Sequence, residues 1–207
     1  MHPNSVYRQQ DDTDALALAT KRGFGVVTAQ LDTLFGGHVP FVQVGERLHL
    51  HFHRGNPLAK AASKAPVPIM LIVSLCDAYV SPDWYAMDDQ VPTWIYGAVH
   101  IHGTLKALPD EALESLLIRL SDTFEARLAP KPIWTMDKMT DKAKIALMRA
   151  IQPFEIEIEK VESTDKFAQN KPVEALESLA KDVPNSFGAN LDLVTERVLY
   201  HAKAKSS

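Results

Sequence analysis

The stretch RLHLHFHRGNP, residues 47–57, carries the clearest indication of how this chain folds. Along its first part, leucine and phenylalanine alternate with arginine and histidine. A period of two is the pattern of a β-strand that buries one face and leaves the other face polar. The strand then gives way to a helix, because Asn56 is a good N-cap and Pro57 suits the first helical position.

Segments on both sides of this stretch add further strands and short helices. The strands expected from β-branched and alternating patterns are 24–30, 36–45, 47–53, 67–75 with 77–81, 93–108 and 154–162. A tight turn in GERL, residues 45–48, joins two of them as a hairpin. The helices expected from caps, charge order and helical spacing are 11–22, 57–64, 110–127, 141–151, 172–182 and 191–202, followed by a frayed end. Gly97 and Gly103 mark bulges or points of close approach in the strand at 93–108.

The order of these elements predicts a mainly β protein with helices, of the α+β class. Strands come first, with little alternation of strand and helix, so an antiparallel barrel or sheet decorated by helices is favoured over a doubly wound parallel sheet. The 207 residues predict a single domain over 1–207, with a core at about 13–171 and a C-terminal helical extension at 172–207. The chain has no glycine-rich phosphate loop of the dinucleotide or Walker kind.

The composition excludes several classes of protein. Hydrophobic residues make up 46% of the chain, which is enough for a sizeable core. The formal net charge of −4 provides no general attraction for DNA or for an anionic membrane. The longest apolar run, PIMLIVSLC, is too short to span a bilayer, and the N-terminal stretch lacks the apolar region of a signal peptide. The lone cysteine, Cys76, lies in an apolar strand and is expected to be a buried, inert thiol of a cytoplasmic protein.

Histidines on two of the expected strands raise the question of a metal site. His49, His51 and His53 share one strand face, and His100 and His102 share another. If these two strands paired, four imidazoles could meet, and imidazole is a common metal ligand. No carboxylate is interleaved with them, so an ordinary polar strand face is the favoured interpretation, and no metal ligand is assigned. The same face could hydrogen-bond a phosphate without a metal.

The segment HRGNP, residues 53–57, suits an anion. The guanidinium of Arg54 can bind a phosphate through two hydrogen bonds, the helix that opens at Asn56 offers free amides, and Lys60 follows about one turn later. An ordinary helix cap beside a solvated arginine explains the same residues. The sequence alone does not separate these two interpretations.

Aromatic residues are concentrated in SPDWY, residues 81–85, and VPTWIY, residues 91–96. Grouped aromatics usually form a core, but the prolines and the acidic AMDDQ between the two segments indicate a loop near the surface. A flat heteroaromatic cofactor would satisfy such exposed rings. The later segment KFAQNK, residues 166–171, offers two lysines and an amide pair, which cap a helix or reach an anionic ligand across an interface. No classical catalytic motif is present, and no catalytic residue is assigned.

Taken in order, the segments GGHVPFV, RLHLHFHRGNPLAKA, AYVSPDWY, VPTWIYGAVHIHG, FEIEIEKVE and KFAQNK resemble the PaiB-type proteins, a family of FMN-binding negative transcriptional regulators. The resemblance covers about residues 24–171. It implies the FMN-binding split barrel, an antiparallel split β-barrel, and a homodimer with flavin sites at its interface. The sequence departs from the family pattern at three positions. Ile95 stands where asparagine is usual, Ala168 where serine is usual, and His53 where a small residue is usual.

The resemblance and the residue chemistry together give a set of expected cofactor-binding residues. They are His38, His51, His53, Arg54, Asn56, Lys60, Ser81, Trp84, Tyr85, Thr93, Trp94, Tyr96, Gln169 and Asn170. The implied cofactor is FMN. Its phosphate is expected at the strand end that carries His51 and Arg54.

Several functions agree with these features. The first is a PaiB-type regulator that binds FMN as a homodimer. No helix-turn-helix pattern is evident and the charge is acidic, so an effect on transcription through a partner or a metabolite fits better than direct DNA binding. The alternatives are a flavin-dependent oxidoreductase acting on a small substrate, a heme- or metal-binding split-barrel protein, and an interaction protein whose flavin site has decayed. In an oxidoreductase the flavin would supply the chemistry, so whether the chain is an enzyme stays open.

Overall fold

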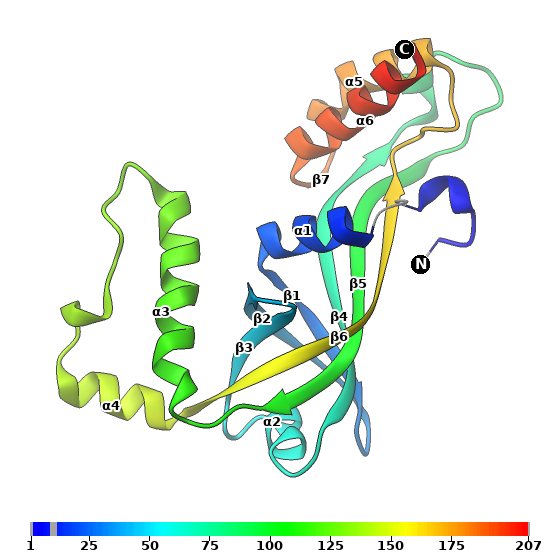
Figure 1. Ribbon diagram of the computed structural model, residues 1–207. Coiled ribbons are helices and arrows are strands. Elements are labelled where there is room, and N and C mark those ends of the chain that lie inside the picture. The colour runs from blue at the N-terminus through cyan, green and yellow to red at the C-terminus, as the bar shows by residue number, and fades with distance from the viewer. Residues whose placement is uncertain (1, 9–11, 207) are drawn as a thin grey trace. The chain divides into compact units, whose positions relative to one another are not determined.

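The computed structural model describes residues 2–8 and 12–206 of the chain, and its strands form one antiparallel sheet (Figure 1). The strand order is β1-β2-β3-β6-β5-β4-β7, and β1 also pairs with β4 at Val26↔Ile72 and Thr28↔Met70. This additional pairing closes six strands into a barrel, as expected for a sheet that removes its own edges. The strands are β1 (Phe24–Gln30), β2 (Leu34–Val44), β3 (Arg47–His53), β4 (Val67–Val80), β5 (Thr93–Ala107), β6 (Ile151–Lys166) and β7 (Gly188–Ala189).

Helices connect and follow these strands. The α-helices are α1 (Asp12–Arg22), α2 (Pro57–Ala62), α3 (Ala112–Glu125), α4 (Asp141–Arg149), α5 (Val173–Asp182) and α6 (Leu191–Ser206). Short 3-10 helices occur at η1 (Ser5–Tyr7), η2 (Pro82–Tyr85), η3 (Ala126–Leu128), η4 (Met136–Lys138) and η5 (Val183–Asn185). None of the helices among the described residues combines the length and the hydropathy needed to cross a bilayer.

Each expected helix is present, with differences at the ends. Residue 11, the expected start of the first helix, lies outside the described residues. Helices α2 and α4 end two residues before the expected positions, and Ile151 belongs to β6 instead of α4. The fraying expected after residue 202 is wrong, because α6 continues to Ser206. In this last turn Lys205 donates to the carbonyl of Lys171 at 2.7 Å, and its charge also suits the negative end of the helix dipole.

The chain packs as two compact units. We call residues 20–72 and 101–160 the barrel unit, and residues 1–19, 73–100 and 161–207 the C-terminal unit. Strands β4, β5 and β6 contribute residues to both units. The single domain over residues 1–207 stays a prediction.

The barrel unit buries the apolar face that the alternation predicted. Leu48, Leu50 and Phe52 of β3 are buried, and β3 pairs with β6 so that Leu50 lies opposite Phe154 and Leu48 opposite Ile156. Burying a side chain of this size contributes about 1.5–3 kcal/mol relative to leaving it exposed. The glutamates on the outer face of β6 are not simply solvated, because Arg47 contacts Glu155 at 2.5 Å, with Glu157 further away at 3.6 Å.

Helices α5 and α6 lie side by side in the C-terminal unit (Figure 1) and supply most of its core. The fully buried members of this core include Ala78, Val80, Phe167, Leu176, Leu179, Val183, Val194 and Val198. Gly97 of β5 lets Phe167 approach, since an added Cβ would stand 3.3 Å from the end of that ring. The close approach expected at Gly97 is therefore confirmed.

Cys76 is part of this core and is expected to resist thiol reagents. The residue is 2% exposed, and burial raises the pKa of the thiol to about 11. Because the thiolate is the reactive form, the native protein should react with Ellman's reagent at pH 8 about a hundredfold more slowly than the urea-unfolded chain. The chain has one cysteine, so the absorbance change reports on this residue alone. Equal rates in native and unfolded protein would contradict a buried thiol.

Candidate functional site

The C-terminal unit contains a polar cavity of about 260 Å³ that collects several of the expected cofactor-binding residues. We call it the lysine cavity. The residues that give it its chemistry are Tyr7, Tyr85, Gln90, Thr93, Ile95, Lys166, Asn170 and Lys171. The cavity therefore combines the neighbouring SPDWY and VPTWIY segments with the KFAQNK segment, which is distant in the sequence.

Local structure places each side of this cavity. Pro82 starts the 3-10 turn η2, which ends at Ala86 with a left-handed φ of 48° and leaves Tyr85 3% exposed. The KFAQNK segment turns at Ala168, whose φ of 59° is unusual for a residue with a Cβ. The backbone N–H of Lys171 donates to the Ala168 carbonyl at 2.8 Å and closes this turn. The two turns bring Tyr85 and Lys171 to the same cavity.

Two ammonium groups dominate the charge of the lysine cavity. Lys166 donates to the hydroxyl of Thr93 at 3.0 Å, and burial lowers the pKa of this lysine. Lys171 donates to the side-chain oxygen of Gln90, and its Nζ lies 5.4 Å from the centre of the Tyr85 ring. One acid, Asp89, also lines the cavity and is exposed. The arrangement suits an anionic or electron-rich ligand.

Two phenols complete the polar lining. Burial raises the pKa of Tyr85 to about 12, and the pKa of Tyr7 is raised by the same cause. Both hydroxyls are therefore protonated at neutral pH and can donate hydrogen bonds to a ligand. Ile95 contributes an apolar wall and is 1% exposed. Asparagine is usual at this position in the PaiB-type proteins that the sequence resembles, and it would add a polar group to the same wall.

Gln169 stabilises the loop behind the cavity and does not line it. Its Oε1 accepts from the backbone N–H of Phe167 at 2.9 Å, and its Nε2 donates to the Val6 carbonyl at 3.0 Å and to the Asp165 carbonyl. These three bonds use both ends of the amide. The structure thus gives Gln169 a positioning role, and its expected contact with a cofactor stays a prediction.

Helix α6 holds the same loop through a buried ion-pair network. Arg197 donates to the carboxylate of Asp165 at 3.1 and 2.6 Å, and His201 Nε2 lies 3.0 Å from the same carboxylate. Burial alone would raise the pKa of Asp165, but the hydrogen bonds from His201 and Arg197 outweigh it and hold this pKa below its ordinary value. The ionised Asp165 is therefore anchored to α6, and it holds the start of the KFAQNK loop, which begins at the next residue.

The expected phosphate site lies in the barrel unit, where its groups already have partners. Arg54 Nη2 contacts Asp110 at 2.7 Å, and Arg54 Nε donates to the Arg149 carbonyl at 3.1 Å. The Asp110 side chain is 61% exposed, and such a surface pair is worth only about 0–1 kcal/mol, so it can exchange for a phosphate. Asn56 caps α2 as predicted, accepting from Leu58 N–H at 2.9 Å. This helix amide is thus occupied by the cap.

The histidines of the expected set lie in different surroundings. His51 Nδ1 is buried and has no hydrogen-bond partner among residues 2–8 and 12–206, and burial lowers the pKa of its ring. An orphaned buried nitrogen of this kind fits a ligand or a water molecule. His53 Nδ1 accepts from the Gly55 N–H at 3.0 Å, and His38 is exposed and stacks on Phe24 at 6.0 Å. Lys60 is exposed on α2 and lines a different cavity together with Lys64.

The strand order removes the geometric basis of the metal hypothesis. Strand β6 lies between β3 and β5, so the strand with His49, His51 and His53 does not pair with the strand that carries His100 and His102. Within the part of the chain that the structure describes, no group of three His, Cys, Asp or Glu side chains is close enough together to hold a metal ion. Among the described strands, the pairing that a four-histidine site would need does not occur.

The expected aromatic residues lie in different surroundings within the C-terminal unit, and their contact with a cofactor stays a prediction. Tyr85 is buried and lines the lysine cavity. Trp84 is partly buried against the helical core. Ser81 is the N-cap residue of η2. Trp94 and Tyr96 lie on the face of β5 opposite to Ile95. Neighbouring residues of a strand point to opposite faces, which separates Trp94 from the cavity.

Trp94 belongs to an exposed aromatic cluster of three residues, Tyr79, Trp94 and Phe187. The rings of Tyr79 and Phe187 stack at 5.1 Å, and Trp94 meets Phe187 edge to face at 5.5 Å. Trp94 is 45% exposed and Phe187 is 62% exposed. Exposed apolar clusters of this kind often mark contact surfaces.

Sequence reasoning missed part of the lysine cavity. Lys166 and Lys171 were recognised as partners for an anion but were not included among the expected site residues. Tyr7 and Gln90 of the cavity, and Phe187 of the exposed aromatic cluster, were not recognised at all. No local pattern marks these three, because their roles depend on contacts with residues distant in the sequence.

Comparison with known proteins decides the family. The family described as "Putative FMN-binding domain" matches residues 1–160. The chain belongs to this family. Protease synthase and sporulation protein PAI 2 of Bacillus subtilis (strain 168) is 30% identical over 157 residues, which cover 73% of this chain and 73% of that protein. The PaiB-type resemblance is thereby confirmed.

Solved structures confirm the split-barrel fold of this family. The FAD and heme binding protein from Mycobacterium smegmatis superposes with a TM-score of 0.58 at 18% identity, covering 77% of this chain and 73% of that one. The flavocytochrome Anf3 from Azotobacter vinelandii gives a TM-score of 0.56 at 12% identity, with 80% and 72% covered. At such identities the likeness shows the fold and does not assign a function.

The family match ends before the KFAQNK loop. Residues 166–171 and the helices α5 and α6 lie beyond residue 160, although the sequence resemblance extends to Lys171. Lys166 and Lys171 are therefore contributed by a part of this chain that the family match does not cover. FMN is the cofactor that the family implies for the chain.

Proposed function

We propose that this protein is an FMN-binding flavoprotein of PaiB type and that the lysine cavity binds the electron-rich edge of the flavin ring. The observation that carries the proposal is the placement of Lys166, Lys171 and two protonated phenols around one cavity in a chain of the FMN-binding family. Positive charge and hydrogen-bond donors are the groups by which a protein binds and tunes a flavin. When bound, the flavin would supply hydride or electron transfer.

Within the barrel unit, and independently of the lysine cavity, we propose Arg54 as a contact for the phosphate of FMN. Its guanidinium suits bidentate phosphate binding, and its exposed pair with Asp110 can be exchanged at little cost. The orphaned Nδ1 of His51, three residues earlier, supports a polar ligand near this strand end. The chemistry of these donors fits a phosphate.

Variants at Arg54 and Lys171 test the two contacts separately. Arg54→Ala should weaken FMN by about tenfold or more while riboflavin, which lacks the phosphate, is affected much less, because a charged hydrogen bond is worth about 1.5–3 kcal/mol. Lys171→Met should weaken FMN and riboflavin to a similar degree, because the ring is common to both. Titration followed by quenching of flavin fluorescence measures all four affinities.

Lys181→Met is the matched control, since Lys181 is exposed on α5 and does not line the lysine cavity. It should leave both affinities unchanged. If Arg54→Ala weakens FMN and riboflavin equally, Arg54 is not the phosphate partner. If wild-type protein ignores both flavins in the titration, FMN binding itself is rejected.

A homodimer and a cytoplasmic regulatory role form the second part of the proposal. The exposed aromatic cluster of Tyr79, Trp94 and Phe187 supports self-association, and the free buried Cys76 suits a reducing compartment. Light scattering coupled to gel filtration tests the dimer, and a monomer at micromolar concentration would reject it.

The net charge of −4 favours regulation through a partner or a ligand, so no salt-sensitive shift of DNA in a gel-mobility assay is expected.

A further inference from the structure

A second cavity lies entirely within the barrel unit, among α3, α4 and the loop between them. Its larger part has a volume of about 520 Å³, and an adjoining apolar part has about 230 Å³. The two parts share Ser121, Trp134, Met136, Met139 and Lys144. We call the whole the hairpin cavity. Volumes of this size are typical of small-molecule sites, and the proposed flavin function uses none of these residues.

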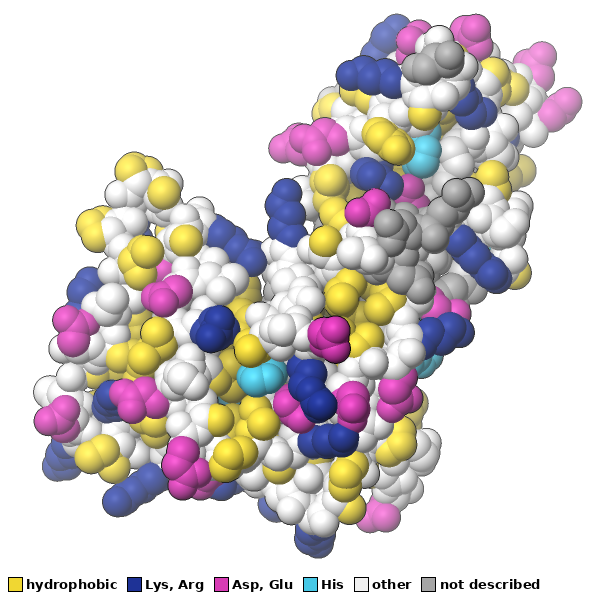
Figure 2. Space-filling model, in the orientation of Figure 1, with side chains coloured by type: hydrophobic (Ala, Val, Ile, Leu, Met, Phe, Trp, Pro, Cys, Tyr) yellow, Lys and Arg dark blue, Asp and Glu magenta, His cyan; other side chains and the backbone are white. Residues whose placement is uncertain are grey.

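The floor of the hairpin cavity is apolar and adaptable. Trp134, Met136, Met139 and Met148 line it, and methionine fits irregular ligands because its side chain is flexible and polarisable. Hydrophobic side chains reach the surface over α3, α4 and their loop (Figure 2), among them Leu147, which is 61% exposed. This part of the barrel unit therefore offers apolar surface that the fold itself does not cover.

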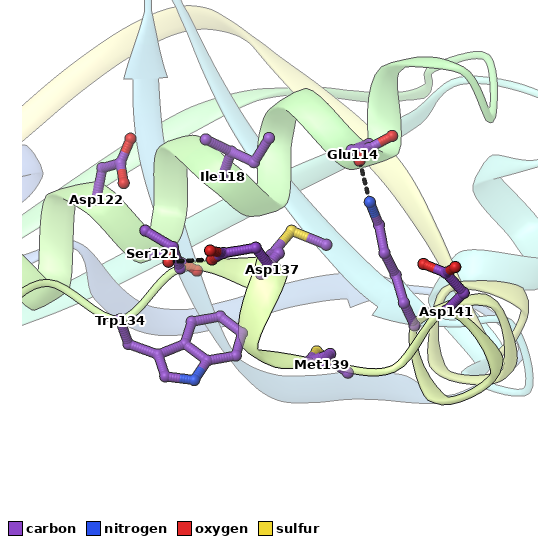
Figure 3. Close-up of a pocket in the computed structure, with 11 residues that line it drawn as sticks. Glu114, Ile118, Ser121, Asp122, Trp134, Asp137, Met139 and Asp141 are labelled. Atoms are coloured by element: carbon purple, nitrogen blue, oxygen red, sulfur yellow. Dashed lines mark hydrogen bonds and ion pairs between the residues drawn. The ribbon is translucent and has the colours of Figure 1, made fainter.

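Trp134 is held in place by an acid behind it. Its backbone N–H donates to Glu125 Oε2 at 2.9 Å, and Lys131 pairs with the same carboxylate. The indole lies near Met139 and Asp137, facing Ser121 of α3 (Figure 3). The hydrogen bond holds the backbone at Trp134, and the indole lines the cavity as an aromatic surface open to a ligand.

The rim of the hairpin cavity is acidic. Among the described residues that line it, Glu114, Asp122, Asp137 and Asp141 are acidic, and Lys144 is basic. Lys144 pairs with Glu114, as the dashed line in Figure 3 shows, which leaves an excess of carboxylates. A hydrogen bond from Thr135 is the main cause that lowers the pKa of Asp137, so this carboxyl is ionised at neutral pH. Lys138 lies beside Asp137 in the sequence and offsets part of this charge.

We propose that the hairpin cavity binds a hydrophobic organic cation. The apolar part of the ligand would contact the methionines and Trp134, and its positive charge would lie near Asp137 and Asp122. A cation is attracted to the electron-rich face of an indole, and the carboxylates add charge complementarity. The excess carboxylates would repel an anionic occupant, and a neutral occupant, including the apolar surface of a second copy of the chain, would gain nothing from them.

Two ions of nearly equal size and opposite charge test the proposal. Tetraphenylphosphonium and tetraphenylborate present the same four rings, so a purely hydrophobic cavity would bind both. We expect the wild-type protein to bind the phosphonium at least about tenfold more tightly than the borate, measured by isothermal titration calorimetry.

Substitutions on the rim locate the binding. Asp137→Asn and Asp122→Asn should each weaken the phosphonium about threefold, and the double variant about tenfold, with no loss of borate binding. Glu46→Gln is the matched control, because Glu46 is exposed in the β2–β3 turn, does not line the cavity, and changes the net charge equally. All three acids are exposed, so the variants should fold normally, and circular dichroism checks this.

Three outcomes would overturn the proposal. They are equal affinities for the two ions, no binding of the phosphonium at millimolar concentration, and a phosphonium affinity that is the same in the double variant as in Glu46→Gln. Trp134→Leu provides an independent readout, because it keeps an apolar side chain and removes the aromatic face, so phosphonium binding should fall more than borate binding. FMN affinity should be unchanged in every one of these variants, which separates this proposal from the flavin proposal.

Discussion

Replacing Asp165 by asparagine should remove about 2–3 kcal/mol from the free energy of unfolding at pH 7, as measured by urea denaturation. Asp165 is 9% exposed and accepts hydrogen bonds from Arg197 and His201 of α6. Asparagine has nearly the same shape, so the loss comes from charge and not from a void. Without the carboxylate, the partly buried guanidinium of Arg197 has no counter-charge, and leaving a buried charge unpaired is costly.

The difference in free energy of unfolding between wild type and Asp165→Asn should depend on pH. The pKa of Asp165 fixes the sign of that dependence. Burial would raise this pKa, but the hydrogen bonds from His201 and Arg197 lower it overall. A carboxyl with a lowered folded-state pKa contributes stability that is fully present above its unfolded-state pKa of about 3.9. That contribution disappears as the pH falls through the lower folded-state value. The difference between wild type and Asp165→Asn should therefore be constant near neutral pH and shrink below about pH 4.

Glu196→Gln is the control for this prediction, because Glu196 precedes Arg197 on α6 but is exposed. It should change the free energy of unfolding by less than about 0.5 kcal/mol. A difference between wild type and Asp165→Asn that grows in acid would contradict the ionised state of Asp165.

The network also connects stability to function, because the Asp165 carbonyl accepts from Gln169, which holds the loop that carries Lys171. Folded Asp165→Asn protein should bind riboflavin more weakly than the control.

Local chemistry explains which parts of the fold could be read from the sequence. Strand β3 was predictable because a half-buried strand imposes a period of two, and the start of α2 because Asn56 and Pro57 satisfy the geometry of a helix start. The boundary at Ile151 was not predictable. A helical pattern continues into this residue, but it pairs with His53 in the sheet, and tertiary pairing overrides local propensity.

The candidate site was predictable only in part, for three physical reasons. Strand order is a property of the whole sheet, so nothing in the histidine pattern indicates that β6 separates β3 from β5. Long-range contacts are equally invisible, as with Tyr7 in the lysine cavity or Arg197 on Asp165. The aromatic segments show a third limit: Trp94 and Ile95 are neighbours in the sequence, yet one is exposed and the other lines the cavity. Counting aromatics along the chain therefore does not show which of them share a cavity.

Gly103 was expected to mark a close backbone approach, and the structure confirms this in the barrel unit. A Cβ built on Gly103 would stand 2.3 Å from the carbonyl oxygen of Glu157 and 3.0 Å from the Ile156 side chain. The first distance is far inside van der Waals contact, and the atom it meets is backbone, which cannot rotate away. Strands β5 and β6 are neighbours in the sheet, so relief requires the two backbones to move apart.

Gly103→Ala should consequently destabilise the protein by about 3 kcal/mol in urea denaturation, at the upper end of the usual cost of overpacking. Gly36→Ala is the matched control, because Gly36 also lies in a strand and an added Cβ there would meet nothing within 4 Å. Where the native conformation tolerates alanine, the change restricts the unfolded chain and stabilises by about 0.4–1 kcal/mol. The two substitutions add the same methyl group to the same unit, so opposite signs would isolate the effect of strand spacing. If both variants unfold at the same urea concentration as the wild type, β5 and β6 are further apart in solution than the structure places them.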